Sequence, residues 1–79
     1  MQRFGEKLRT LRKRHAMTIT ELALALGYTA NSYISEIETG KKKPTTEFVF
    51  KVARLFNVTT DQLLDDELDV PGMAPTAGE

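Results

Sequence analysis

Cysteine is absent from the 79-residue sequence, and so is any long apolar run. Without cysteine, neither a disulfide framework nor a thiolate metal site can hold the fold together, and a reducing cytoplasm is the expected compartment. No apolar stretch approaches the roughly 20 residues that cross a bilayer. The polar start MQRFGEKLRT lacks the apolar segment of a signal peptide. We therefore expect a soluble, cytoplasmic protein with a single domain.

Positive charge is missing from the C-terminal part of the chain. All eleven lysines and arginines lie in residues 1–56 together with five acids, whereas residues 57–79 contain six acids and no base. The net charge of zero thus hides a separation of charge, which favours a basic face for an anion and an acidic segment elsewhere. Basic residues that are merely solvated on exposed helix faces would give the same numbers of charged residues in the two segments. Charge alone therefore leaves both interpretations open.

Strand-like alternation of useful length is also missing, whereas apolar residues recur with helical spacing. Phe4, Leu8 and Leu11 mark one face of a first helix that extends to about His15. Four more helices follow: one from about residue 19 to Gly27, one from Asn31 to Gly40, one after Thr45 up to Phe56, and a short one that contains Leu63 and Leu64.

Two kinds of polar signal mark the helix ends. Threonine at a helix start accepts a hydrogen bond from the backbone, and glycine at a helix end adopts the left-handed conformation at no steric cost. Capping boxes of the form T-x-x-E or T-x-x-Q open the second and fifth helices. The residues concerned are Thr18 with Glu21, Thr59 with Gln62, Thr45, Gly27 and Gly40.

These patterns predict an all-α fold, a compact bundle of five helices over residues 1–68. Residues 69–79, DVPGMAPTAGE, are rich in small residues, proline and glycine and show no periodicity, so we expect a disordered tail. The predicted core consists of Leu8, Leu11, Leu22, Leu26, Ile34, Ile37, Val52, Leu55, Phe56 and Leu63.

The second and third helices are short, amphipathic toward a common core and joined by a polar turn that begins at Gly27. This arrangement is a helix-turn-helix. In that motif the second helix lies in the major groove with its N-terminal residues against base edges, while the first helix crosses the phosphate backbone. The motif therefore predicts that Asn31, Ser32 and Tyr33 face DNA.

The run MTITELALALGYTANSYISEIETGKKKP, followed by LFNVTTDQLL, resembles the phage-repressor and Cro-type helix-turn-helix domains of the Xre family over residues 3–66. The resemblance implies a five-helix, lambda-repressor-like domain with double-stranded DNA as its partner. It further implies a transcription regulator, with repression the expected role, that binds a roughly palindromic operator as a homodimer. The sequence departs from the family pattern in two places. Ile19 replaces the usual glutamine, and the segment from Gly27 to Gly40 is one residue longer than in the family's shortest members.

The head of the third helix offers several candidate DNA-binding side chains. Asn31 and Ser32 either cap the helix or contact base edges, since asparagine can bind adenine bidentately. Thr29 is the expected cap and a further phosphate contact. Tyr33 packs on the domain with its hydroxyl toward DNA, or is merely a half-buried aromatic. Glu36 either accepts from cytosine or stays solvated, because an acid is repelled by a polyanionic groove.

Two further segments are candidate phosphate contacts. Lys41, Lys42 and Lys43 follow the third helix, where they either solvate a loop or bind phosphate. Thr18 and Ile19 begin the second helix, whose N-terminal backbone amides can bind phosphate without the usual glutamine.

Arg12 and Glu38 match a family ion pair between the first and third helices. Removal of one partner should cost roughly 3–5 kcal/mol if the pair is buried, but an exposed pair contributes under about 1 kcal/mol. His15 lies far from any cysteine or acidic cluster at ligand spacing, so it is expected to pack at the end of the first helix. We expect no metal, no cofactor and no enzyme activity, because no catalytic constellation is present.

Other functions remain open at this stage. The family also includes restriction-modification controllers and antitoxins. A different class is a protein-interaction module that keeps the fold with weak or no DNA binding, and Ile19 and Glu36 favour it. An RNA-binding role is a weaker hypothesis, because the chain has only six aromatic residues and several of them are committed to the core. For a homodimer, the expected surface lies around the fifth helix, with contributions from the fourth helix, Leu68 and Val70.

Overall fold

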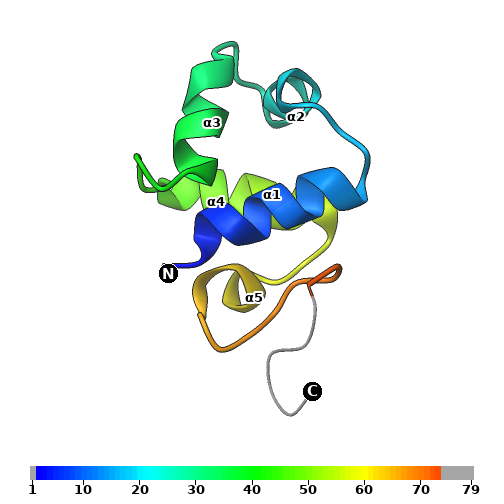
Figure 1. Cartoon of the computed structure of the whole chain (residues 1–79), viewed down its shortest axis with the longest axis vertical. Coiled ribbons are helices and arrows are strands. Elements are labelled where there is room, and N and C mark those ends of the chain that lie inside the picture. Colours follow the sequence, from blue (N-terminus) through cyan, green and yellow to red (C-terminus); the bar gives the residue numbers. More distant parts are fainter. Residues whose placement is uncertain (1, 74–79) are drawn as a thin grey trace.

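Five helices make up the molecule, as the sequence predicts. The structure, a computed structural model, describes residues 2–73 and contains no strand within them. The helices are α1 (Phe4–Arg14), α2 (Ile19–Leu26), α3 (Asn31–Glu38), α4 (Thr46–Phe56) and α5 (Thr60–Leu64). In Figure 1, α1 and α4 occupy the middle of the molecule, with α2 and α3 at one end and α5 at the other. None of these helices is long and apolar enough to cross a membrane.

Threonine side chains begin three of the helices. The capping boxes of Thr18 with Glu21 and of Thr59 with Gln62 are both present at the starts of α2 and α5. Thr45 accepts from the amide of Phe48 and caps α4. Each such cap stabilises the domain by roughly 0.5–2 kcal/mol, so these local signals are confirmed as true helix starts.

The end of α3 is a Schellman motif, which determines where the basic loop begins. Gly40 has a φ of +86°, and its amide donates to the Ile37 carbonyl over 3.2 Å. The amide of Lys41 donates to the Glu36 carbonyl over 2.8 Å. A left-handed glycine at this position turns the chain sharply, so the three lysines leave the helix as an exposed loop.

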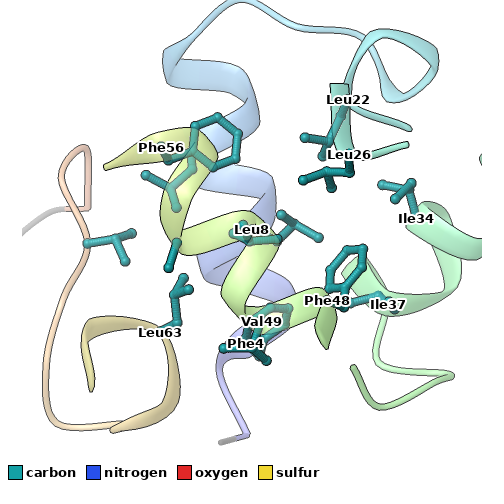
Figure 2. Packing of buried hydrophobic residues seen from close by; sticks show 14 of the residues in the cluster. Phe4, Leu8, Leu22, Leu26, Ile34, Ile37, Phe48, Val49, Phe56 and Leu63 are labelled. Carbon is teal, nitrogen blue, oxygen red and sulfur yellow. The ribbon is translucent and has the colours of Figure 1, made fainter. Parts of the chain in front are cut away.

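The core fills the space among the helices, and nine of the ten predicted core residues are buried there (Figure 2). The exception is Leu55, which is 38% exposed, so its assignment to the core is wrong. The buried face of α4 is centred on Val52, with Phe48 and Phe56 one turn to either side. Leu55 lies about 60° around the helix from Val52 and points away from that face.

The segment after α5 packs on the domain. Val70 is 2% exposed and belongs to the core, so the prediction of disorder is wrong for residues 69–73. Arg3 holds this segment by donating to the Asp66 carbonyl over 2.7 Å and to the Asp69 carboxylate over 3.0 Å. The rest of the predicted tail, residues 74–79, lies outside the described residues, and the boundary at residue 68 stays a prediction.

Lys7 is the buried charge of the core. Its ammonium donates to the carbonyls of Gln62 and Asp65 over 2.6 and 2.7 Å, at the end of α5. Desolvation lowers the pKa of Lys7. The sequence analysis missed this residue, although Lys7 lies on the apolar stripe of α1 beside Leu8.

Candidate nucleic-acid interface

A close contact between backbones positions α3 against α1. A Cβ atom added at Gly5 would lie within 2.6 Å of the carbonyl oxygens of Ile37 and Glu38. Real Cβ atoms do not approach backbone oxygens so closely, so only glycine permits α1 to touch the end of α3. The helix that would read DNA is therefore fixed at its C-terminal end.

An ion pair fastens the same end of α3. The Arg12 guanidinium donates to both carboxylate oxygens of Glu38, from Nε over 2.7 Å and from Nη2 over 3.1 Å. The side chains are only 12% and 5% exposed, and Arg12 also donates to the Met17 carbonyl over 3.0 Å. The hydrogen bond with Glu38 raises the pKa of Arg12. The structure thus brings this predicted pair together in a nearly buried, bidentate geometry.

The opposite end of α3 lacks a side-chain cap. Its N-cap residue is Ala30, whose methyl group accepts no hydrogen bond, so the prediction that Thr29 caps the helix is wrong. Neither Asn31 nor Ser32 caps it, and both side chains are exposed. The reason is that α3 begins at Asn31, one residue later than a cap at Thr29 requires, so alanine stands at the cap position. The first turn of α3 therefore presents uncapped amides and two polar side chains to solvent.

Thr20 joins the candidate site, although the sequence analysis did not include it. Asn31 Nδ2 donates to Thr20 Oγ1 over 2.7 Å, across the turn between α2 and α3. One amide N–H and the oxygen of Asn31 remain, which are the one donor and one acceptor that adenine binds bidentately. Only the geometry of the turn brings these residues together, so neither residue's local sequence signals the contact.

Tyr33 is half-buried in an aromatic cluster. Its ring centroid lies 5.5 Å from that of Phe48, edge-on, and 5.2 Å from that of Tyr28. The ammonium of Lys42 lies 5.8 Å from the Tyr33 ring centroid. The ring therefore attaches the first turn of α3 to α4, and within residues 2–73 its hydroxyl makes no hydrogen bond.

Glu36 and Lys42 partly neutralise each other. The Lys42 ammonium lies 3.5 Å from Glu36 Oε1, and both side chains stay well exposed, at 56% and 38%. Lys41 and Lys43 are exposed in the same loop and have no carboxylate partner among residues 2–73. Two of the three predicted lysines are thus free to attract an anion beside α3.

The start of α2 presents a second feature that favours an anion, the partial positive charge of its free backbone amides. The capping box uses the amides of Thr18 and Glu21, while those of Ile19 and Thr20 find no acceptor among residues 2–73. Two free amides at a helix N-terminus bind an anion well. The Ile19 side chain is half-buried against the core, so any contact of Ile19 with phosphate runs through its backbone.

His15 lies outside this surface. Its ring is exposed at the end of α1 and tilts against Phe56, with 4.9 Å between ring centroids, so it packs where the sequence predicts. No group of three or more histidine, aspartate or glutamate side chains suited to a metal occurs in the part of the chain that the structure describes.

Comparison with known sequences decides the family. A sequence profile described as helix-turn-helix matches residues 8–63, which include all of α2 and α3. The chain belongs to this helix-turn-helix family. The uncharacterized HTH-type transcriptional regulator YobD of Bacillus subtilis (strain 168) is 37% identical over 61 residues. The HTH-type transcriptional activator BcrR of Enterococcus faecalis is 39% identical over 64 residues.

Solved structures of helix-turn-helix proteins have the same fold. The N-terminal DNA-binding domain of SinR from Bacillus subtilis superposes with a TM-score of 0.76 at 31% identity, covering 85% of this chain and 97% of that one. SinR in complex with DNA superposes with a TM-score of 0.71 at 33% identity, covering 78% and 98%. The lambda-repressor-like architecture implied by the sequence is therefore confirmed.

The helix-turn-helix relatives differ from this chain in length. The match covers 77% of this chain but 54% of YobD, and 81% of this chain but 31% of BcrR. The chain thus spans about half of the first relative and under a third of the second.

The family is one of DNA-binding transcription regulators and not a class of enzymes.

Proposed function

We propose that this chain binds double-stranded DNA sequence-specifically and regulates transcription, with α3 in the major groove. The observation that carries the proposal is the exposed, uncapped head of α3, where Thr20 holds Asn31 with one donor and one acceptor free. These two groups suit the N7 and N6 positions of adenine. The structure of SinR in complex with DNA supports the proposal, because SinR binds DNA there and has the same fold as this chain over 78% of this chain's length.

Phosphate contacts on both sides of α3 would fix its register. The free amides at the start of α2 lie before α3 in the chain, and Lys41 and Lys43 follow it. In a helix-turn-helix the first helix crosses one strand of the backbone while the second enters the groove. Tyr33 and Thr29 complete this surface, since both line a hollow of about 330 Å³ beside Ser32 and Lys42.

In this proposal, the chain binds a roughly palindromic operator as a homodimer and represses transcription. A single domain of this size contacts few bases, so two half-sites one helical turn apart would raise affinity and specificity. The exposed side of α5 is the surface we expect at the two-fold axis. Val70 cannot contribute, because its side chain lies in the core of its own domain.

A salt titration on duplex DNA tests the proposal. If a dimer neutralises about eight phosphates, log affinity falls against log salt with a slope near −7. Replacement of Lys41 and Lys43 by alanine removes two contacts per copy and should flatten this slope by about 3.6. Lys13→Ala is the control, since Lys13 is exposed on α1 and lies beside Gly72 of the C-terminal segment. Binding that is independent of salt would refute DNA recognition.

Selection from a random duplex library tests sequence recognition separately. The expected product is an inverted repeat with an adenine at a fixed position in each half-site. Asn31→Ala should remove the preference at that position and cost about 1–3 kcal/mol on the selected site. Enrichment of no sequence, or an unchanged preference in Asn31→Ala, would contradict the assignment of α3.

A protein-interaction module with weak DNA binding is the second candidate. The ion pair of Glu36 with Lys42 favours it, because it leaves less positive charge beside α3. The structure of SinR with SinI shows that a similar chain takes part in a protein complex. The same salt titration separates the two candidates, since an interaction module gives no steep salt dependence on DNA.

A further inference from the structure

Two exposed leucines remain outside every surface described so far. Leu24 on α2 is 69% exposed and Leu55 on α4 is 38% exposed. They line the same shallow groove of about 440 Å³, which runs between the C-terminal half of α2 and α4. Lys51 and Arg54 line this groove as well. The groove is thus a shallow depression that offers two exposed leucines and two cations.

Of the two cations, Arg54 is the one that lacks a carboxylate partner among the described residues. Lys51 lies 3.3 Å from the Glu47 carboxylate and 4.8 Å from the Tyr28 ring centroid. Arg54 makes no hydrogen bond or ion pair with any of the described residues. An unpaired guanidinium binds a carboxylate well, so the groove suits an acidic segment that also carries an apolar side chain.

The chain itself contains such a segment after α5. Residues 65–69 read DDELD, and their one apolar side chain, Leu68, is 41% exposed. Asp66 and Asp69 are held by the backbone amides and the guanidinium at the start of α1. The carboxylate of Glu67 has no partner among residues 2–73. Leu68 and Glu67 are therefore presented on a fixed backbone, which lowers the entropy cost of docking.

The groove and the acidic segment belong to opposite ends of the molecule. In Figure 1, α2 lies at one end, the segment after α5 at the other, and α1 and α4 between them. We propose that the groove of one molecule binds the segment Asp65–Asp69 of a second copy. Leu68 then lies between Leu24 and Leu55, and Glu67 pairs with Arg54.

This contact is head to tail and goes beyond the proposed function. The pair keeps one unused groove on one copy and one unused segment on the other, so further copies can add in the same way. The buried surface would be small, so this contact alone associates free copies weakly, in addition to the two-fold dimer proposed above. Copies placed side by side on DNA would bind cooperatively, because the duplex raises their effective concentration.

Charge reversal tests the contact in the full chain without DNA. Sedimentation equilibrium over about 10 µM to about 1 mM covers the range expected of so small an interface. Arg54→Glu and Glu67→Arg should each lower the association constant about tenfold or more, because like charges then meet. The double variant R54E/E67R should regain wild-type association, since every contact again joins opposite charges. Both residues are exposed, so folding is preserved.

A second pair of variants tests the apolar part of the contact, in which Leu68 packs against the leucines of the groove. Leu68→Ser should weaken association to a similar degree, whereas Phe50→Ser is the control, since Phe50 is exposed on α4 but does not line the groove. A double variant that associates no better than either single variant overturns the proposal. So does loss of affinity for a single DNA half-site in Arg54→Glu, because the groove would then be a phosphate contact. Failure of DNA binding in the wild type leaves this test intact.

Discussion

The ammonium of Lys7 lies 2.6 Å from the backbone carbonyl oxygen of Gln62 and joins α5 to α1 from inside the core. The same ammonium also binds the Asp65 carbonyl, so one buried charge serves two carbonyls at the end of a helix of five residues. Because so short a helix has little stability of its own, α5 depends on this contact with α1.

Lys7→Met should therefore destabilise the domain by about 1–3 kcal/mol, since the carbonyls of Gln62 and Asp65 lose the buried ammonium that donates to them. Urea unfolding followed by circular dichroism measures the change. Lys13→Met is the control, because Lys13 is exposed on the same helix and should change stability by less than about 0.5 kcal/mol. Equal stability of Lys7→Met and wild type would show that water replaces the ammonium.

Asp66 should make the domain sensitive to acid. Its carboxylate accepts from the amides of Arg3 and Gln2, each over 3.1 Å, and these bonds lower the pKa of Asp66. A carboxylate with a lowered pKa stabilises the fold above the unfolded pKa near 4, and this stabilisation is lost as pH falls through the folded pKa.

The comparison of wild type with Asp66→Asn checks this prediction. The free energies of unfolding should differ at pH 7 and converge as the pH falls below about 4. Glu67→Gln serves as the reference, because the Glu67 carboxylate has no partner among the described residues. A constant difference between wild type and Asp66→Asn at every pH would contradict the assignment.

Loss of either partner of the ion pair between Arg12 and Glu38 should cost about 3–5 kcal/mol, because a nearly buried charge is left uncompensated. A double-mutant cycle with Arg12→Met and Glu38→Gln measures the coupling. The double variant should be more stable than the sum of the single losses predicts. Additive losses would mean that the two side chains act independently. Any surviving variant should also show weaker binding to the selected operator, because α3 loses its anchor.

Thr20→Val should lower affinity for the selected operator by about 1 kcal/mol, because Asn31 then loses the partner that orients its amide. Affinity for random duplex should stay unchanged, since no phosphate contact is removed. Competition binding at one salt concentration measures both values, and Thr10→Val is a control on α1. A parallel loss on random and selected DNA would show that Thr20 binds phosphate instead.

Local chemistry made most of the fold predictable from the sequence. Threonine caps and left-handed glycines act within a few residues, so Thr18, Thr59 and Gly40 marked their helix ends correctly. The assignment of Leu55 to the core was wrong because the apolar pattern of α4 is wider than its buried face, and Leu55 lies at the edge of that pattern. The burial of Val70 was not predicted, because a single apolar side chain shows no periodicity. Arg3, which is distant in the sequence, holds the segment that brings Val70 onto the core.

The candidate site was predictable only in part. The exposed positions of Asn31 and Ser32 follow from their place at the head of a helix. The contact of Asn31 with Thr20 does not, because it spans 11 positions and exists only once the turn has formed. Thr29 was assigned wrongly as the cap, since α3 begins at Asn31 and Ala30 stands at the cap position. The DNA-binding roles of these residues stay predictions.

The absence of a side chain at Gly5 has a mechanical consequence for recognition. Because two helix backbones touch there without intervening atoms, α3 cannot tilt to suit different operators unless α1 moves with it. In the proposed complex, the domain should therefore enter the major groove of DNA as a rigid body. Adjustment to a site of unfavourable shape then falls to the duplex, whose stiffness becomes part of the selectivity.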